Sequence, residues 1–191
     1  MDSIHNILDY RLAIIQRFGQ FTWTSFAVYL CWVIGCGLAA LVLVEALCPA
    51  ARGGGIPEIK TALSGTVKRD LFSSRLVTAK SLGLVLSLLA GLSVGKEGPM
   101  IHISCACADL LMQTAPFRKL YQHGAQRISI LTCAAGVGVT SVFGTAYGGM
   151  IFALELTSFS FLTKDLPQIF LSCVSCLVVF LYLDHNAQYL L

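Results

Sequence analysis

Long apolar stretches, separated by short polar or glycine-rich segments, account for most of the chain. Because an α-helix rises about 1.5 Å per residue, roughly 20 apolar residues suffice to cross a bilayer core about 30 Å thick. The apolar stretches long enough to do so are Phe21–Pro49, Leu76–Val94, Ile128–Thr157 and Phe161–Leu183. We expect them to form membrane helices, and the third is long enough for two helices with a break near Gly144.

Two breaks of similar composition interrupt this apolar pattern. The first reads Gly53-Gly54-Gly55-Ile56-Pro57, and the second reads Gly95-Lys96-Glu97-Gly98-Pro99. Proline fits the first turn of a helix, where its missing N–H would have no partner, and glycine permits backbone conformations that other residues avoid. Each break is therefore expected to lead into a short helix, over 58–66 after the first and over 100–112 after the second.

Composition and charge exclude several classes of protein. Only 12% of the 191 residues are charged and 56% are hydrophobic, with a mean hydropathy of +0.76, whereas soluble domains carry about 25% charged residues. Such a chain cannot cover a water-soluble surface, and it is too apolar for disorder. The net charge of +3 comes from scattered basic residues, so a nucleic-acid partner is not expected. We expect a multi-pass integral membrane protein whose main partner is the lipid bilayer.

The polar segments indicate the domain boundaries. Residues 1–20 are mixed in charge and lack the apolar core of a signal peptide. We therefore expect a short amphipathic lead-in over 1–20, followed by a membrane domain over 21–191. The loops at 67–75 and 118–127 are both basic, so the positive-inside rule leaves the orientation open.

The eight cysteines lie within or at the ends of apolar stretches. Cys173 and Cys176 have the spacing of a metal or redox pair, but no second pair of Cys or His residues follows at zinc-site spacing. We interpret the cysteines as small apolar residues of membrane helices and expect no metal site. No nucleophile–base pair stands out either, so an enzyme is not expected.

The two breaks are the strongest candidates for a functional site. Backbone that is not helical at membrane depth leaves N–H groups that lipid cannot satisfy, so such breaks occur where they line a cavity or a site. A helix that begins there directs free N–H groups and about half a positive charge at that site. Two converging helix starts would form an anion site, whereas ordinary turns at the membrane interface are the alternative.

Glu97 lies inside the second break, and acids within membrane segments usually serve a function. Beside an anion site, its carboxylate would repel the anion, so we interpret it as a competitor that occupies the empty site and leaves when protonated. This behaviour would make Glu97 a gate; the alternative is an interfacial acid in water. The neighbouring Lys96 either attracts anions or pairs with Glu97. His102 is expected to be a hydrogen-bonded packing residue rather than a ligand or proton carrier.

These residues resemble the CLC family of chloride channels and transporters. The segment 53–58 is similar to the family motif GSGIPE, and 95–99 together with His102 is similar to GKEGPxxH. Residues 134–157 are similar to the family segment that follows. The resemblance implies an all-α membrane fold of tilted and broken helices, of which this chain would hold the first inverted-repeat half, over 21–191.

The resemblance also implies a mechanism. The family members form homodimers with a separate anion pathway in each subunit, the transported ion is chloride, and no cofactor is required. Glu97 would be the gating residue. The anion-binding residues would be Gly54, Gly55, Ile56, Lys96 and Gly98.

Three departures from the family pattern qualify this reading. The family's usual serine at the central anion site falls on Gly54, which removes a hydroxyl donor and leaves the preferred anion open. Proton-coupled members carry a glutamate directly after the position of Glu155, where this chain has Leu156. The family's second half, with its GxFxP segment and anion-binding tyrosine, and the CBS domains of many members have no counterpart here.

We therefore expect a fragment of a voltage-gated chloride channel that passes anions passively. A chloride/proton antiporter is the alternative within transport. From a different class, the chain would be a non-conducting subunit that associates with a full-length relative.

Overall fold

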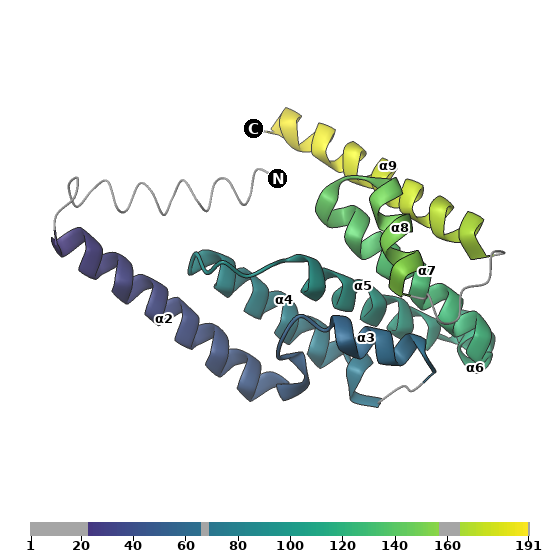
Figure 1. Ribbon diagram of the computed structural model, residues 1–191, viewed down its shortest axis with the longest axis horizontal. Helices are drawn as coiled ribbons and strands as arrows, with labels where there is room; N and C mark the ends of the chain where they lie inside the picture. Colours follow the sequence, from purple (N-terminus) through teal and green to yellow (C-terminus); the bar gives the residue numbers. More distant parts are fainter. Residues whose placement is uncertain (1–22, 66–68, 157–164, 191) are drawn as a thin grey trace.

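The computed structural model describes residues 23–65, 69–156 and 165–190, which form helices joined by short turns and contain no strand (Figure 1). In chain order the elements are α2 (Trp23–Leu47), the 3₁₀ turn η1 (Pro49–Ala51), α3 (Ile56–Leu63), the 3₁₀ turn η2 (Arg69–Phe72), α4 (Ser74–Leu89), α5 (Glu97–Met112), the 3₁₀ turn η3 (Ala115–Phe117), α6 (Arg118–Gln122), α7 (Gly124–Phe143), α8 (Ala146–Leu156) and α9 (Leu166–Leu190). The predicted all-α fold class is confirmed. The predicted lead-in over 1–20 and the start of the stretch 161–183 lie outside the described residues.

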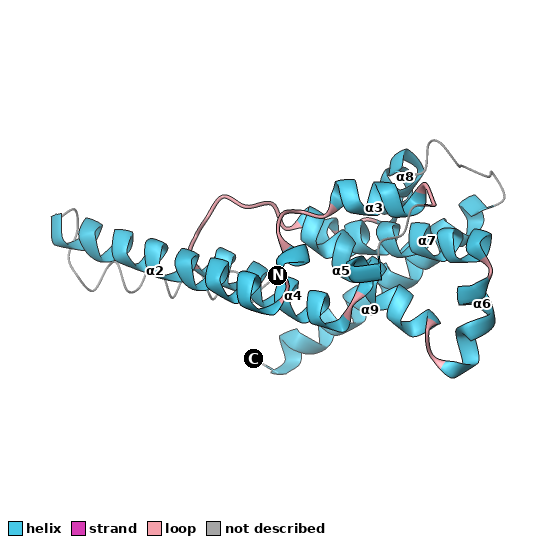
Figure 2. Cartoon of the chain, turned by 90° about the horizontal axis from the view of Figure 1, so that it is seen from below, coloured by secondary structure: helices cyan, strands magenta, loops and turns pink. Residues whose placement is uncertain are grey.

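The helices follow one another across the molecule in a chain of contacts (Figures 1 and 2). α2 lies along α4 at one edge, α4 also contacts α5, and α5 packs against α7. α8 and α9 pack on α7 and on each other, and the short α3 contacts both α5 and α7. The main core lies among α3, α5 and α7, where Ile59, Ile101, Cys105, Leu131 and Ala135 are buried.

Three helices in the described part of the chain are long and apolar enough to cross a membrane. They are Phe26–Leu47 within α2, α7 (Gly124–Phe143), and Leu166–Leu183 within α9. In α2 only 6% of the apolar window is buried, in α9 11%, and in α7 50%. α7 is therefore the central helix of the bundle, while α2 and α9 present most of their apolar surface outward.

The spanning helix predicted over 76–94 is wrong in its extent. α4 covers Ser74–Leu89, 16 residues, and residues 92–95 are not helical. Gly91 adopts a φ of +73°, a conformation that glycine accepts without strain and that ends the helix. The second break therefore begins several residues before the Gly95 predicted from the sequence.

The other short helices begin slightly earlier than predicted. α3 starts at Ile56 with Pro57 as its second residue, and α5 starts at Glu97 with Pro99 in its first turn. Both prolines thus occupy the part of the helix where a missing N–H leaves no bond unmade. The predicted break near Gly144 is confirmed, because Gly144 has a φ of +65° and separates α7 from α8.

Glycine allows α7 and α8 to approach closely. A Cβ on Gly149 of α8 would overlap the carbonyl oxygen of Gly136 and the hydroxyl of Thr140, both on α7. A Cβ on Gly136 would lie 2.9 Å from the Cys173 sulfur of α9. Small residues that let helix backbones approach are a common device for packing helices in membranes.

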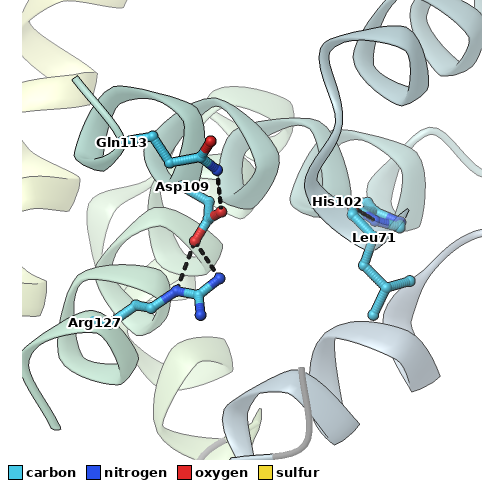
Figure 3. Close-up of polar contacts among 5 residues, drawn as sticks. All are labelled: Leu71, His102, Asp109, Gln113 and Arg127. Atoms are coloured by element: carbon cyan, nitrogen blue, oxygen red, sulfur yellow. Dashed lines mark hydrogen bonds and ion pairs between the residues drawn. The ribbon is translucent and has the colours of Figure 1, made fainter. Parts of the chain in front are cut away.

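An ion pair between a buried aspartate and a partly exposed arginine joins α5 to α7. Asp109 is 1% exposed, and its Oδ1 accepts hydrogen bonds from Arg127 Nε at 2.7 Å and from Arg127 Nη2 at 2.6 Å (Figure 3). The other carboxylate oxygen accepts from Gln113 Nε2 at 2.9 Å. The guanidinium of Arg127 lies 4.5 Å from the centroid of the Tyr121 ring, within the range of a cation–π contact. The guanidinium of Arg127 therefore compensates the negative charge of the Asp109 carboxylate.

Candidate anion site

The structure brings the two glycine-rich breaks into contact. A Cβ on Gly98 would lie 3.1 Å from both the Cα and the carbonyl oxygen of Gly54. The two segments are more than 40 positions apart in the sequence, so the contact comes from the packing of α3 and α4 against α5. Backbones can meet this closely only because neither residue carries a side chain.

Two helices begin beside this contact. α3 begins directly after Gly55 and α5 directly after Lys96, and neither N-cap residue makes a side-chain hydrogen bond to its helix. The first backbone N–H groups of both helices are thus left without a capping side chain, at the positive ends of the two helix dipoles. Such a pair of helix starts favours a negatively charged ligand.

A cleft of about 510 Å³ adjoins the two breaks. Its walls come from α2, α4, η1 and both breaks, and they include Arg52, Gly53, Gly54, Gly95 and Pro99. At one side Arg52 Nε donates to Glu45 Oε2 at 2.8 Å, and Arg52 Nη2 contacts the other carboxylate oxygen. The hydrogen bond that Arg52 donates to the Glu45 carboxylate raises the pKa of Arg52 above its ordinary value.

Glu97 is half-buried and is the first residue of α5. Its carboxylate turns back over Gly95, where an added Cβ would lie 2.5 Å from Glu97 Oε2. Neither Glu97 nor Lys96 lines the cleft. The two ion pairs found among the described residues are Glu45–Arg52 and Asp109–Arg127, so the alternative in which Lys96 simply pairs with Glu97 is not what the structure shows.

The other residues predicted to bind the anion differ in how far they are exposed and in whether they line the cleft. Gly54 is exposed and lines the cleft, whereas Gly55 and Gly98 are buried. Ile56 packs its side chain against the main core. Only its backbone, at the start of α3, is therefore in a position to contribute to an anion site.

Sequence reasoning missed Lys80 of α4. Its side chain is 3% exposed, it lines the cleft, and its Nζ lies 2.8 Å from Nδ1 of the fully buried His102 on α5. The other ring nitrogen, Nε2, lies 3.0 Å from the carbonyl oxygen of Leu71 (Figure 3). Since a carbonyl only accepts, Nε2 carries the proton and Nδ1 accepts a hydrogen bond from the Lys80 ammonium. The expectation that His102 is a hydrogen-bonded packing residue is confirmed.

Gly55 is the backbone element that accommodates this pair. It adopts a φ of +89°, and a Cβ at this position would overlap the His102 ring and lie 2.9 Å from Lys80 Nζ. The lysine and histidine therefore lie directly against the first break. The only signal in the sequence was a single cation inside an otherwise apolar stretch, without a spacing that links it to either break.

Comparisons with known proteins identify the family of the chain. A family model described as "Voltage gated chloride channel" matches residues 36–190. The H(+)/Cl(-) exchange transporter 5 of Rattus norvegicus is 38% identical over 157 residues, which is 82% of this chain and 19% of that protein; the human protein of that name is 37% identical over the same lengths. Chloride channel protein F of Dictyostelium discoideum is 34% identical over 153 residues, which is 78% of this chain and 19% of that protein.

A solved structure has the same fold. The crystal structure of a eukaryotic CLC transporter matches with a TM-score of 0.85 and 29% identity, over 93% of this chain and 33% of that one. The chain thus spans about a fifth of the length of the curated relatives it matches.

Proposed function

The chain belongs to the voltage gated chloride channel family and is a multi-pass integral membrane protein, and on this premise we propose that it forms part of a passive chloride pathway gated by Glu97. The observation that carries the proposal is the contact between the two breaks at Gly54 and Gly98. It places the uncapped starts of α3 and α5 beside one cleft. Backbone N–H groups at helix starts stabilise an anion without requiring a covalent or cofactor step.

The gating role of Glu97 is supported by its position and by its lack of a counter-ion. The residue opens α5, one position before Gly98, and takes part in neither ion pair of the described residues. A carboxylate at a helix start is itself attracted by the backbone N–H groups and the dipole. It therefore competes with chloride for the same positive charge, and its movement would open or close the pathway.

Passive conduction is favoured over exchange by Leu156. This residue is 6% exposed and belongs to the main core, so the position that carries a glutamate in proton-coupled family members holds a side chain that cannot bind a proton. Several relatives, however, are named H(+)/Cl(-) exchange transporters. Coupled exchange of chloride and protons is therefore the second candidate.

Current recordings test the gate. The protein is expressed from its complete reading frame, and Glu97→Gln is compared with wild type and with Glu155→Gln, a matched change of an exposed acid on α8. Glu97→Gln is expected to weaken or abolish the dependence of open probability on voltage, because the competing charge is gone. Unchanged voltage dependence in Glu97→Gln, or an equal change in Glu155→Gln, would contradict the gating role.

Flux measurements separate the candidate functions. In proteoliposomes with an imposed chloride gradient, the channel predicts chloride flux without proton movement, whereas proton uptake in fixed proportion to chloride supports the exchanger. Absence of flux from the protein alone, restored only with a longer relative, supports the non-conducting subunit. We also propose that the intact protein is a homodimer. Light scattering in detergent tests this, because a dimer has twice the protein mass of one protomer.

A further inference from the structure

The short helix α6 carries an exposed basic surface at the edge of the bundle. It lies between α5 and α7, at the margin of the molecule in both views (Figures 1 and 2). Arg118, Lys119 and His123 are exposed, and Phe117, which precedes them, is 48% exposed. We refer to Phe117, Arg118, Lys119 and His123 as the α6 corner. It combines two permanent cations with an exposed aromatic side chain.

The acids on neighbouring elements leave this charge uncompensated. Asp109 of α5 pairs with Arg127. Glu155 of α8 and Asp165, which precedes α9, take part in neither of the two ion pairs found in the part of the chain that the structure describes. The two cations of the α6 corner do not take part in them either, so both keep their full charge at the surface.

The inner side of α6 is fixed to the bundle. Tyr121 is half-buried and packs against the main core, and the Arg127 guanidinium lies 4.5 Å from the centroid of its ring. Arg127 is itself held by Asp109. A cation–π contact thus anchors α6 on α7, while Arg118 and Lys119 remain exposed.

The α6 corner lies where two membrane spans begin. Ser129 of α7 donates to Gln168 of α9 at 3.4 Å. Further along both helices by the same number of positions, Cys176 Sγ lies 3.8 Å from the Val137 carbonyl oxygen. Equal steps mean that α7 and α9 run parallel, so their apolar spans start at the same surface of the bilayer. Because α6 directly precedes α7, the corner lies at that surface as well.

Both basic loops of the chain meet at this end. The Phe72 ring of η2 lies 6.0 Å from the same Arg127 guanidinium that contacts α6, and the exposed Arg75 follows at the start of α4. The loops at 67–75 and 118–127, which left the orientation open, therefore lie on one side. An excess of basic residues on one side favours the cytoplasmic surface, and the leaflet there carries the anionic lipids.

We propose that the α6 corner binds the phosphate headgroup of an anionic phospholipid, with Arg118 and Lys119 as the cations and Phe117 set between headgroups and acyl chains. Basic residues beside Phe and Leu side chains are typical of segments in this boundary, and Leu111 near the end of α5 is 62% exposed. The N-cap residue of α7, His123, makes no side-chain hydrogen bond to its helix, so the start of α7 adds to the attraction. This binding is independent of chloride transport.

Thermal unfolding in detergent, followed by tryptophan emission, tests the site on the protein expressed from its complete reading frame. Dioctanoyl phosphatidylserine is expected to raise the melting temperature in a saturable manner, because a ligand of the native state stabilises it. Dioctanoyl phosphatidylcholine and inorganic phosphate at the same concentration should not do so. Higher salt should weaken the effect of phosphatidylserine, because the contacts are made by exposed charges.

Charge substitutions locate the site. Arg118→Gln together with Lys119→Gln should weaken phosphatidylserine binding about 25-fold, which is about fivefold for each cation near an anionic surface. Arg118→Lys together with Lys119→Arg keeps both charges and should bind like wild type. Lys60→Gln removes an exposed cation from α3 and should change the affinity less than about twofold, since solvent and salt screen a charge on a different helix.

Equal stabilisation by phosphatidylserine and phosphatidylcholine, or by inorganic phosphate alone, would overturn the proposal. A glutamine pair that binds as tightly as wild type would overturn it too, as would a Lys60→Gln variant that loses as much affinity as that pair. Because the lipid and salt comparisons use the wild-type protein, they decide the matter even if the glutamine pair does not fold.

Discussion

Gly53 and Gly55 allow the packing of the first break to be separated from its backbone conformation. Both glycines adopt positive φ values, +71° and +89°, so replacing either with alanine carries a similar conformational cost of about 1–2 kcal/mol. They differ in their surroundings. A Cβ on Gly53 meets nothing within 4 Å, whereas a Cβ on Gly55 would overlap the His102 ring.

The expected difference between the two variants follows from the bond that Gly55 protects. An alanine there must displace His102 and break its hydrogen bond with Lys80, and a hydrogen bond to a charged group is worth about 1.5–3 kcal/mol. Gly55→Ala should therefore lower the free energy of unfolding by about 2.5–5 kcal/mol, and Gly53→Ala by about 1–2 kcal/mol.

The assay is unfolding in mixed detergent micelles, followed by tryptophan emission. Trp32 reports on the contact between α2 and α4, and far-UV circular dichroism reports on helix content. Equal losses in the two variants would refute the reasoning, because they would mean that the Lys80–His102 pair is not held against Gly55. A larger loss in Gly53→Ala would refute it as well.

Three further predictions concern the ion pair, the glycine contact and the gate. Asp109→Ala leaves the partly buried Arg127, whose side chain is 16% exposed, without a counter-ion and should lower the free energy of unfolding by about 3 kcal/mol. The double change to Asp109→Leu and Arg127→Met should recover most of this loss, and a double variant as unstable as the single one would contradict it. Gly149→Ala introduces a Cβ into the backbone of α7 and should reduce the melting temperature in detergent by several degrees, since overpacking costs about 1–3 kcal/mol. Gly95→Ala meets only the flexible end of Glu97, so it should leave stability unchanged while shifting the voltage of half-activation, and an unaltered voltage would argue against the gate.

The parts of the structure that the sequence predicted are those with local signals. The breaks at Gly53–Pro57 and Gly95–Pro99 and the one near Gly144 are marked by glycine and proline, whose backbone restrictions act on adjacent residues. The extent of α4 was overestimated because apolar composition continues to Val94, although Gly91 marks its end. Hydropathy measures where lipid is tolerated and does not show where a helix stops.

Lys80 illustrates what a single sequence cannot show. Its partner lies 22 positions away on a different helix, and its contact with Gly55 depends on how α3, α4 and α5 pack together. No periodicity within one helix encodes such a contact. For the same reason the contact between Gly54 and Gly98 was a hypothesis until the arrangement of the helices was known.

The unequal burial of the three long helices has a consequence for biogenesis. A nascent helix partitions from the translocon into lipid by itself only if its own side chains favour the bilayer. The window in α2 has a mean hydropathy of 2.4, and the window in α9 one of 2.1, whereas α7 reaches only 1.2. α7 therefore depends on neighbours to shield its polar groups, and two of these, α8 and α9, are translated after it. We expect its integration into the bilayer to be delayed until those helices have left the ribosome.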